Sequence, residues 1–134
     1  MSIQFTVPLS KLIKTLNIQA IYMPPSDSEV LVSSADINRP GLQLVGFFDY
    51  FNGERIQLFG RSEVAYLMQL TQEERQKSLE KLFAAEPVAV IFSRDITPEP
   101  MVIDLAKKYQ VPLLGTPETT SNFSSALNAM LNTE

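Results

Sequence analysis

The sequence predicts a single α/β domain in which a mainly parallel sheet is flanked by helices. Three observations support this fold class. The chain has 134 residues, which is the usual size of one domain. Strand patterns alternate with helical patterns from residue 55 to residue 134, an order typical of parallel α/β sheets. Residues 88–92 form a continuous apolar run, as expected for a strand buried on both faces of such a sheet.

The first half of the chain contains one clear helical pattern and several short extended segments. The apolar spacing i, i+3, i+4, i+7 predicts a helix through Leu9, Leu12, Ile13 and Leu16. Pro8 suits the start of this helix, where a missing N–H costs nothing. Residues 19–23 and 30–32 are predicted as short strands. Residues 35–41 are predicted as a polar loop, because Pro40 disfavours helical backbone at Arg39 and Gly41 permits a tight turn.

The second half repeats a strand–helix order. Strands are predicted at residues 56–59, 88–92 and 111–114. Helices are predicted to begin at Ser62, at Thr71, at Thr97-Pro98 and at Thr119 or Thr120. The Thr71 helix has the clearest start, because Glu74 follows three residues later and completes a capping box. The side chains expected to face the core are Val64, Ala65, Leu67, Met68, Leu79, Leu82, Phe83, Val102, Leu105, Ala106, Tyr109, Phe123, Leu127, Met130 and Leu131.

Composition excludes several classes of function. The chain has no histidine, cysteine or tryptophan, so disulfides, Cys/His zinc sites and Ser-His or Cys-His dyads are ruled out. A net charge of −4 gives nucleic acid no general attraction. No run approaches the roughly 18 apolar residues of a membrane span, and the first residues lack a signal-peptide pattern. We therefore expect a cytoplasmic domain without nucleic-acid or membrane partners, and no metal site.

The glycine pair Gly41 and Gly46 has the spacing of a phosphate-binding loop but not its chemistry. Phe47-Phe48 follow it in place of Lys-Ser/Thr, so no ammonium group can reach a phosphate and no hydroxyl can hold magnesium. The acidic residues are scattered, and no carboxylate pair stands out for acid–base chemistry. We expect no catalytic residues in this chain.

Three polar loops, at residues 36–41, 93–95 and 116–121, each follow a predicted strand. If the strands are parallel neighbours, these loops meet at the edge of the sheet where α/β folds bind ligands. The predicted ligand is a small anion or a nucleotide, and the candidate residues are Asp36, Arg39, Arg94, Thr119, Thr120 and Ser121. Simpler interpretations stay open: a local Asp36–Arg39 ion pair, an exposed loop arginine at position 94, and plain helix capping by one hydroxyl.

An aromatic cluster follows the glycine pair. Its members are Phe47, Phe48, Tyr50 and Phe51. It suits either core or subunit packing, which we favour, or a surface for a base or a partner.

Two longer motifs carry a family resemblance. Residues 36–42 are D-I-N-R-P-G-L, and residues 55–63 are R-I-Q-L-F-G-R-S-E. An apolar strand at residues 87–94, then Pro98-Glu99-Pro100, then Thr119-Thr120-Ser121 follow in order. Over essentially its whole length the chain resembles the N-terminal domain of HPr kinase/phosphorylase.

This resemblance implies a role in bacterial carbon catabolite control. The family is bifunctional: it phosphorylates a serine of the phosphocarrier HPr with ATP or pyrophosphate, and it reverses that reaction. Its chemistry lies in a C-terminal P-loop domain that is absent here, so residues 1–134 correspond to the single N-terminal domain. The resemblance implies a non-catalytic regulatory or assembly domain, with the kinase domain and HPr as partners, in a homo-oligomer. ATP and magnesium would serve the parent enzyme, and this chain would hold no cofactor.

Two more distant resemblances suggest small-ligand sensing. The domain is similar to the UDP-binding N-terminal domain of the Mur ligases, with residues 36–41 in place of their D-S-R and P-G stretch. The second half also resembles the DRTGG regulatory modules. The alternative function is therefore a free-standing module that binds a nucleotide or a nucleotide sugar.

Overall fold

A five-stranded, mostly parallel sheet forms the centre of the domain in the computed structural model, which describes residues 7–16, 18–24, 31–32, 37–48, 51 and 53–133. In spatial order the strands are β2 (Gln19–Tyr22), β7 (Leu113–Gly115), β6 (Val90–Phe92), β5 (Ile56–Phe59) and β4 (Ile37–Asn38). β4 to β7 are parallel, and β2 pairs antiparallel with β7 at one edge. The predicted fold class is confirmed. A separate antiparallel pair, β1 (Val7–Pro8) with β3 (Leu31–Val32), was not predicted.

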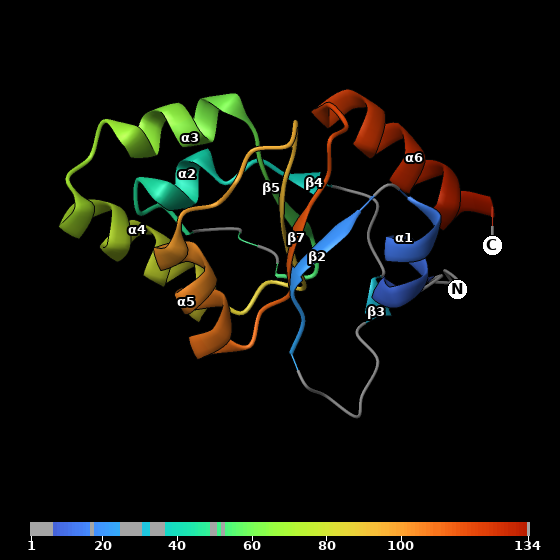
Figure 1. Cartoon of the computed structure of the whole chain (residues 1–134), viewed down its shortest axis with the longest axis horizontal. Helices are drawn as coiled ribbons and strands as arrows, with labels where there is room; N and C mark the ends of the chain where they lie inside the picture. The colour runs from blue at the N-terminus through green and yellow to red at the C-terminus, as the bar shows by residue number, and fades with distance from the viewer. Residues whose placement is uncertain are drawn as a thin grey trace.

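Helices cover both faces of the sheet (Figure 1). One face carries α2 (Gly41–Leu44), α3 (Arg61–Met68), α4 (Gln72–Ala84) and α5 (Pro100–Tyr109). The other face carries α1 (Leu9–Thr15) and α6 (Thr120–Thr133). The chain therefore changes face after β7, whereas all earlier crossovers between parallel strands stay on the first face.

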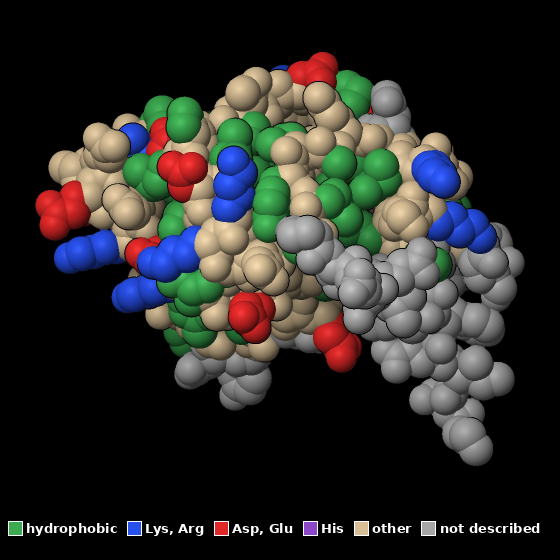
Figure 2. Space-filling view, turned by 60° about the horizontal axis from the view of Figure 1, so that its bottom comes forward, with side chains coloured by type: hydrophobic (Ala, Val, Ile, Leu, Met, Phe, Trp, Pro, Cys, Tyr) green, Lys and Arg blue, Asp and Glu red, His purple; other side chains and the backbone are tan. Residues whose placement is uncertain are grey.

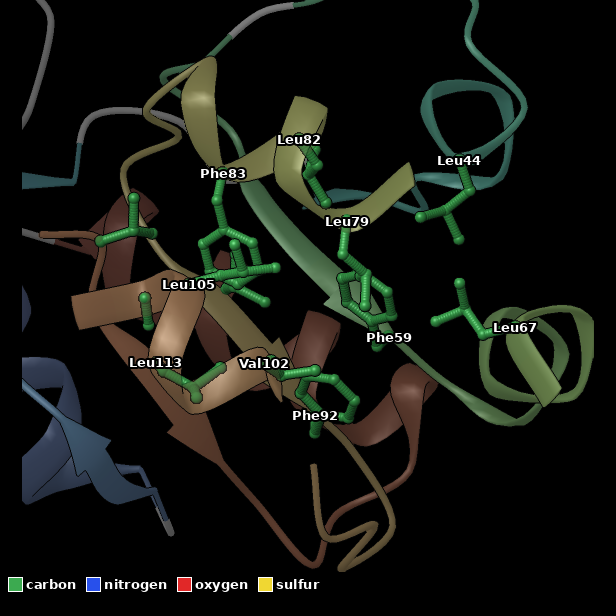
Figure 3. Packing of buried hydrophobic residues seen from close by; sticks show 13 residues of the cluster. Leu44, Phe59, Leu67, Leu79, Leu82, Phe83, Phe92, Val102, Leu105 and Leu113 are labelled. Atoms are coloured by element: carbon green, nitrogen blue, oxygen red, sulfur yellow. The ribbon is translucent and has the colours of Figure 1, made fainter. Parts of the chain in front are cut away.

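The sheet separates two hydrophobic cores, because successive strand residues point to opposite faces. On the first face, Phe59 and Phe92 stack with ring centroids 4.8 Å apart. Leucines from four helices pack around these rings, as Figure 3 shows. On the second face, Leu58 and Ile91 pack against Phe123 of α6. This alternation explains why β5 and β6 are wholly buried.

Helix starts differ from the predicted positions in two places. α3 is capped at Gly60 rather than Ser62, because the Glu63 carboxylate reaches back to accept a hydrogen bond from the Gly60 N–H. α5 begins at Pro100 rather than at Thr97-Pro98, since Pro100 occupies the first turn. The Thr71 capping box of α4 and the Thr119 cap of α6 are confirmed.

The predicted inward face of α3 is partly wrong. Leu67 is buried and Val64 is half-buried, but Ala65 and Met68 are exposed. The helix phase is set by the two buried positions Glu63 and Leu67, which are four residues apart on one face. Because Glu63 is charged, its burial could not be predicted from hydrophobic spacing.

Charged side chains are mixed on the surface. On the face shown in Figure 2, lysines and arginines gather around α4 and α5, with acidic side chains among them. Within the described part of the chain, no helix has the length and apolar character to cross a bilayer. Within the same residues, no group of three or more His, Cys, Asp or Glu side chains is placed to hold a metal ion.

Candidate functional site

The two motifs that carry the family resemblance bond to each other. Asn38 at the end of β4 donates to the Gln57 Oε1 of β5 and to the Gln43 Oε1 of α2, the latter at 2.9 Å. Gln57 is fully buried and Gln43 nearly so. Buried amides need such partners, because an unpaired polar group in a core is costly. The network explains why residues 37–41, predicted as part of a polar loop, form a short strand and the start of a short helix.

Arg39 forms an ion pair with Glu63. Its Nε and Nη2 donate to the two carboxylate oxygens at 3.1 and 2.7 Å. The side chain of Glu63 is only 7% exposed, and that of Arg39 is 40% exposed. Burial alone would raise the pKa of Glu63, but hydrogen bonds from Arg39 and from the Gly60 amide outweigh it and lower that pKa.

Gly60 makes room for this ion pair. A Cβ at position 60 would lie 2.6 Å from the Arg39 Nη2. The guanidinium thus crosses the bare backbone at the end of β5 and reaches the first turn of α3. The predicted local pairing of Arg39 with Asp36 concerns a residue that lies outside the described part of the chain. The partner found, Glu63, is 24 residues away.

The other predicted loops lie at the same edge of the sheet. Phe59, Phe92 and Gly115 are in register, so the chain leaves β5, β6 and β7 at one level. Arg39 follows β4 and Arg94 follows β6, with β5 between them. Two strand spacings separate their backbones by about 10 Å. The sheet thus gathers the predicted loops at its carboxyl edge, while Arg39 is engaged by Glu63.

The loop after β6 is bonded to the loop after β7. The backbone N–H of Arg94 donates to the Glu118 carbonyl, and that of Asp95 donates to the Thr116 carbonyl, both at 3.0 Å. Arg94 and Asp95 both have φ of 57°, in the left-handed region that few side chains adopt. Two consecutive residues in this region form a tight turn that the second loop holds in place. The Arg94 side chain is exposed.

The threonine-rich segment begins α6. The Thr119 Oγ1 accepts a hydrogen bond from the Asn122 N–H at 3.2 Å, which is ordinary helix capping. Thr120 and Ser121 are the first residues of the helix, half-buried and exposed respectively.

A pocket of about 230 Å³ opens at the carboxyl ends of β6 and β7. It is lined by Gln19, Ile21, Asp95, Ile96, Thr97, Pro98, Ile103, Gly115, Thr116 and Pro117. None of the six candidate residues predicted from sequence belongs to this lining. Asp95 and Thr116 are the immediate neighbours of predicted segments. Gln19 and Ile21 come from β2, whose place beside β7 no local pattern indicates.

The aromatic cluster is divided between surface and interior. Phe48 and Phe51 are half-buried and meet edge to face, with centroids 5.6 Å apart. Phe47 is 44% exposed, beside Leu42 and Val45 of the α2 region at 61% each. Tyr50 lies outside the described residues. Core packing thus accounts for part of the cluster.

An open, mostly parallel sheet with helices on both faces and a pocket at its carboxyl edge defines this protein as an open-sheet α/β domain. Within that class, the chain belongs to the family described as the HPr Serine kinase N terminus, which matches residues 7–131.

Relatives named HPr kinase/phosphorylase are similar along almost the whole chain. The protein of Caldicellulosiruptor bescii is 37% identical over 130 residues, which cover 97% of this chain and 42% of the relative. That of Streptococcus uberis is 35% identical and that of Lactococcus lactis 34% identical, each covered to 41%. The chain therefore spans about two fifths of the length of these relatives.

One solved structure shares the fold. It contains the CBS and DRTGG domains of the regulatory region of a Clostridium perfringens pyrophosphatase, complexed with the activator diadenosine tetraphosphate. The TM-score is 0.65 at 18% sequence identity, over 92% of this chain and 47% of that one.

Proposed function

We propose that this chain is a non-catalytic regulatory and assembly domain of an HPr kinase/phosphorylase. The observation that carries the proposal is the mutual bonding of the family motifs. Asn38 with Gln57, and Arg39 with Glu63, hold β4, β5 and α3 together instead of meeting around a reacting group. The segment with P-loop spacing, residues 41–46, is a short helix and a turn.

In this proposal the chemistry lies in the parent protein outside these residues. A P-loop domain would bind ATP or pyrophosphate with magnesium and act on HPr. The present domain would bind that kinase domain within a cytoplasmic homo-oligomer and change its response, with no cofactor of its own. The exposed apolar residues near α2, which are Leu42, Val45 and Phe47, support the assembly part, because clustered exposed apolar side chains mark interaction surfaces.

A deletion experiment tests this function. A full-length relative, such as the Caldicellulosiruptor bescii protein, is compared with a form lacking the region that matches this chain. We expect HPr phosphorylation to persist in the shortened enzyme, with altered oligomeric mass or altered dependence on small effectors. Complete loss of phosphorylation by a folded, ATP-binding kinase domain would contradict a non-catalytic role.

The alternative is a free-standing sensor of a nucleotide or nucleotide sugar. The shared fold with a regulatory region supports this sensor function. A gene whose reading frame continues into a G-x-x-x-x-G-K-[ST] motif would argue against a free-standing sensor. In this reading Arg94, Thr119, Thr120 and Ser121 would contact the anionic part of the ligand. Arg39 is engaged by Glu63, and Asp36 lies outside the described residues.

Thermal shift with a panel of nucleotides, UDP-sugars and sugar phosphates tests the anion site. A ligand at 100 times its dissociation constant should add about 2.7 kcal/mol of stability. Arg94→Asn should abolish that shift and leave the ligand-free melting temperature nearly unchanged, because asparagine tolerates the left-handed backbone at this position. A shift that survives this substitution would exclude Arg94 from the site.

A further inference from the structure

The chain leaves β6 and β7 toward opposite faces of the sheet. After β6 it crosses to α5 on the face that also carries α2, α3 and α4. After β7 it crosses to α6 on the other face, as Figure 1 shows. Two neighbouring parallel strands whose connections part in this way leave a crevice between their carboxyl ends. Open α/β sheets bind their ligands in such a crevice.

The 230 Å³ pocket lies at the carboxyl ends of these two strands, on the face of the sheet that carries α5, and we refer to it as the crevice. Its walls come from the loop after β6, the end of β7, the antiparallel neighbour β2 and the side of α5. The volume lies below the roughly 300–1,000 Å³ of sites for drug-sized molecules. The pocket therefore suits a compact ring.

The chemistry of the lining indicates an uncharged ligand with hydroxyl groups. Asp95 is the one charged side chain among the described residues of the lining, and it is exposed. Its carboxylate accepts hydrogen bonds strongly and repels phosphate. The Thr97 hydroxyl and the Gln19 amide are also exposed and can donate or accept. Isoleucines 21, 96 and 103 supply an apolar wall.

The backbone at Asp95 is held in one conformation by hydrogen bonds to the neighbouring loop. Its left-handed conformation is fixed by the hydrogen bond of its N–H to the Thr116 carbonyl. The Ile96 N–H closes the turn on the Ser93 carbonyl at 3.0 Å, and the buried Ser93 hydroxyl donates to the Phe59 carbonyl of β5. Backbone strain of this kind gathers at ligand sites. A loop whose backbone is already ordered loses less entropy on binding.

We propose that this crevice binds the vicinal diol of a compact, uncharged ring, of the kind found in a monosaccharide or in the ribose of a nucleoside. Asp95 accepts hydrogen bonds from the two hydroxyls, Thr97 and Gln19 contact the ring edge, and the isoleucine wall contacts its apolar face. This site deepens the proposed regulatory function. The regulatory effect of the ligand rests on that function, whereas binding itself is a property of the isolated domain.

Titration of the ¹⁵N-labelled 134-residue chain, followed by NMR, tests the site. The probes are D-glucose, uridine, 2′-deoxyuridine and inorganic phosphate at millimolar concentrations. We expect saturable shifts of the amide signals of residues 95–97 and 116 with glucose or with uridine. Comparing the glucose titration with the uridine titration shows whether the ligand is a sugar or a nucleoside. If uridine binds, 2′-deoxyuridine should bind at least about tenfold more weakly, because it lacks the diol.

Matched variants separate binding from folding. Asp95→Asn should lower affinity about tenfold, since the charged acceptor is lost while asparagine suits the left-handed backbone. Asp104→Asn, at an exposed position of α5 outside the lining, should change nothing. Gly115→Ala is a second variant: the added methyl lies in the pocket wall, 3.4 Å from the Ile21 Cδ1, so binding should fall while the fold persists.

Several results would overturn the proposal. The first is that neither glucose nor uridine gives saturable shifts, and the second is that only phosphate does. The third, if uridine is the ligand, is that 2′-deoxyuridine binds equally well. The fourth is that the folded variants Asp95→Asn and Gly115→Ala keep full affinity. Each of these leaves the deletion experiment on the parent enzyme unaffected. Failure of the ligand site and failure of the regulatory function are thus distinguishable.

Discussion

At the scale of single residues, the Arg39–Glu63 ion pair is the main evidence that the family motifs have a structural role. Arg39 belongs to a loop that was predicted from the sequence to bind a ligand, and Glu63 is the last residue of the second family motif. The structure instead uses them to join the end of β4 to the first turn of α3, across the bare backbone of Gly60. An arginine beside a strand end is therefore not by itself a sign of an anion site.

Replacing Glu63 by glutamine should destabilise the domain by about 2 kcal/mol. The amide keeps the shape but gives up the charge that faces Arg39, and hydrogen bonds to charged groups contribute roughly 1.5–3 kcal/mol. Partial exposure of Arg39 keeps the loss below that of a fully buried pair. Urea unfolding measures the change. Glu86→Gln, at an exposed position, is the control and should cost under about 0.5 kcal/mol.

The same carboxylate should make stability depend on pH. The pKa of Glu63 in the folded state is lowered from its ordinary value of 4.5. Its contribution is therefore complete above pH 4.5 and is lost as the pH falls through the lower folded value. Glu74 and Glu80 also have lowered pKa values and contribute in the same direction. The difference in stability between the wild type and Glu63→Gln should shrink on acidification below pH 4.5. If the difference in stability stays constant down to pH 2, Glu63 is not the source of the pH dependence.

Gly60 and Arg39 should be coupled. In the wild type, Gly60→Ala brings a methyl within 2.6 Å of the guanidinium and displaces it from Glu63. In an Arg39→Ala background the same change meets no guanidinium, and the backbone of Gly60, with φ −115°, is open to alanine. A double-mutant cycle should give a coupling energy of about 1 kcal/mol. Additive losses would mean that Gly60 is needed for another reason.

At the scale of elements, the α5 helix tests the assignment of buried faces. Leu105 is 4% exposed within the first core, and its replacement by alanine should cost about 2–5 kcal/mol. Lys107, two residues on, is exposed, and Lys107→Ala should cost under about 0.5 kcal/mol. Chemical denaturation of the two variants compares them. Equal small losses would mean that the helix does not bury this face.

The strength of local signals decided which elements could be predicted from the sequence. β5, α4 and α6 were predicted well, because the short extended segment at residues 56–59, the Thr71 capping box and the Thr119 cap are local patterns. β4 and α2 could not be predicted, since two and four residues carry no periodicity and depend on side-chain bonds to β5. The antiparallel pairing of β2 with β7 joins segments more than ninety residues apart, which no spacing rule detects.

The shared edge of the polar loops could be predicted from the sequence, but the lining of the pocket found there could not. Polar loops that follow parallel strands were expected to meet at the carboxyl edge of the sheet, and β5, β6 and β7 do end there at one level. The pocket, however, is lined by Asp95, Thr97 and Thr116 from those loops and by Gln19 from β2. The sequence favoured arginines because charge is the visible sign of an anion site. Which side chains face a crevice depends on backbone turns such as the left-handed pair at Arg94 and Asp95.

At the scale of the whole molecule, the domain is built to keep its two cores apart and its carboxyl edge open. Helices α2 to α5 close one face, and α1 and α6 close the other. The hydrogen bonds among residues of the two motifs stabilise this architecture. We propose that ligands and partners act at the crevice and at the apolar surface near α2. The chain spans about two fifths of the length of its relatives, and in the function that we propose phosphoryl transfer belongs to the remainder of such a protein.

The most direct test of this account is a phosphorylation assay with the 134-residue chain alone. The purified chain is mixed with HPr, ATP and magnesium, and phosphoserine on HPr is measured by mass spectrometry, beside a full-length relative as the positive control. The account predicts no phosphoserine above a buffer blank from the isolated chain, and robust product from the relative. The contradictory result is phosphorylation of HPr by the isolated chain. This activity would have to follow the chain through purification and be abolished by a substitution in the chain.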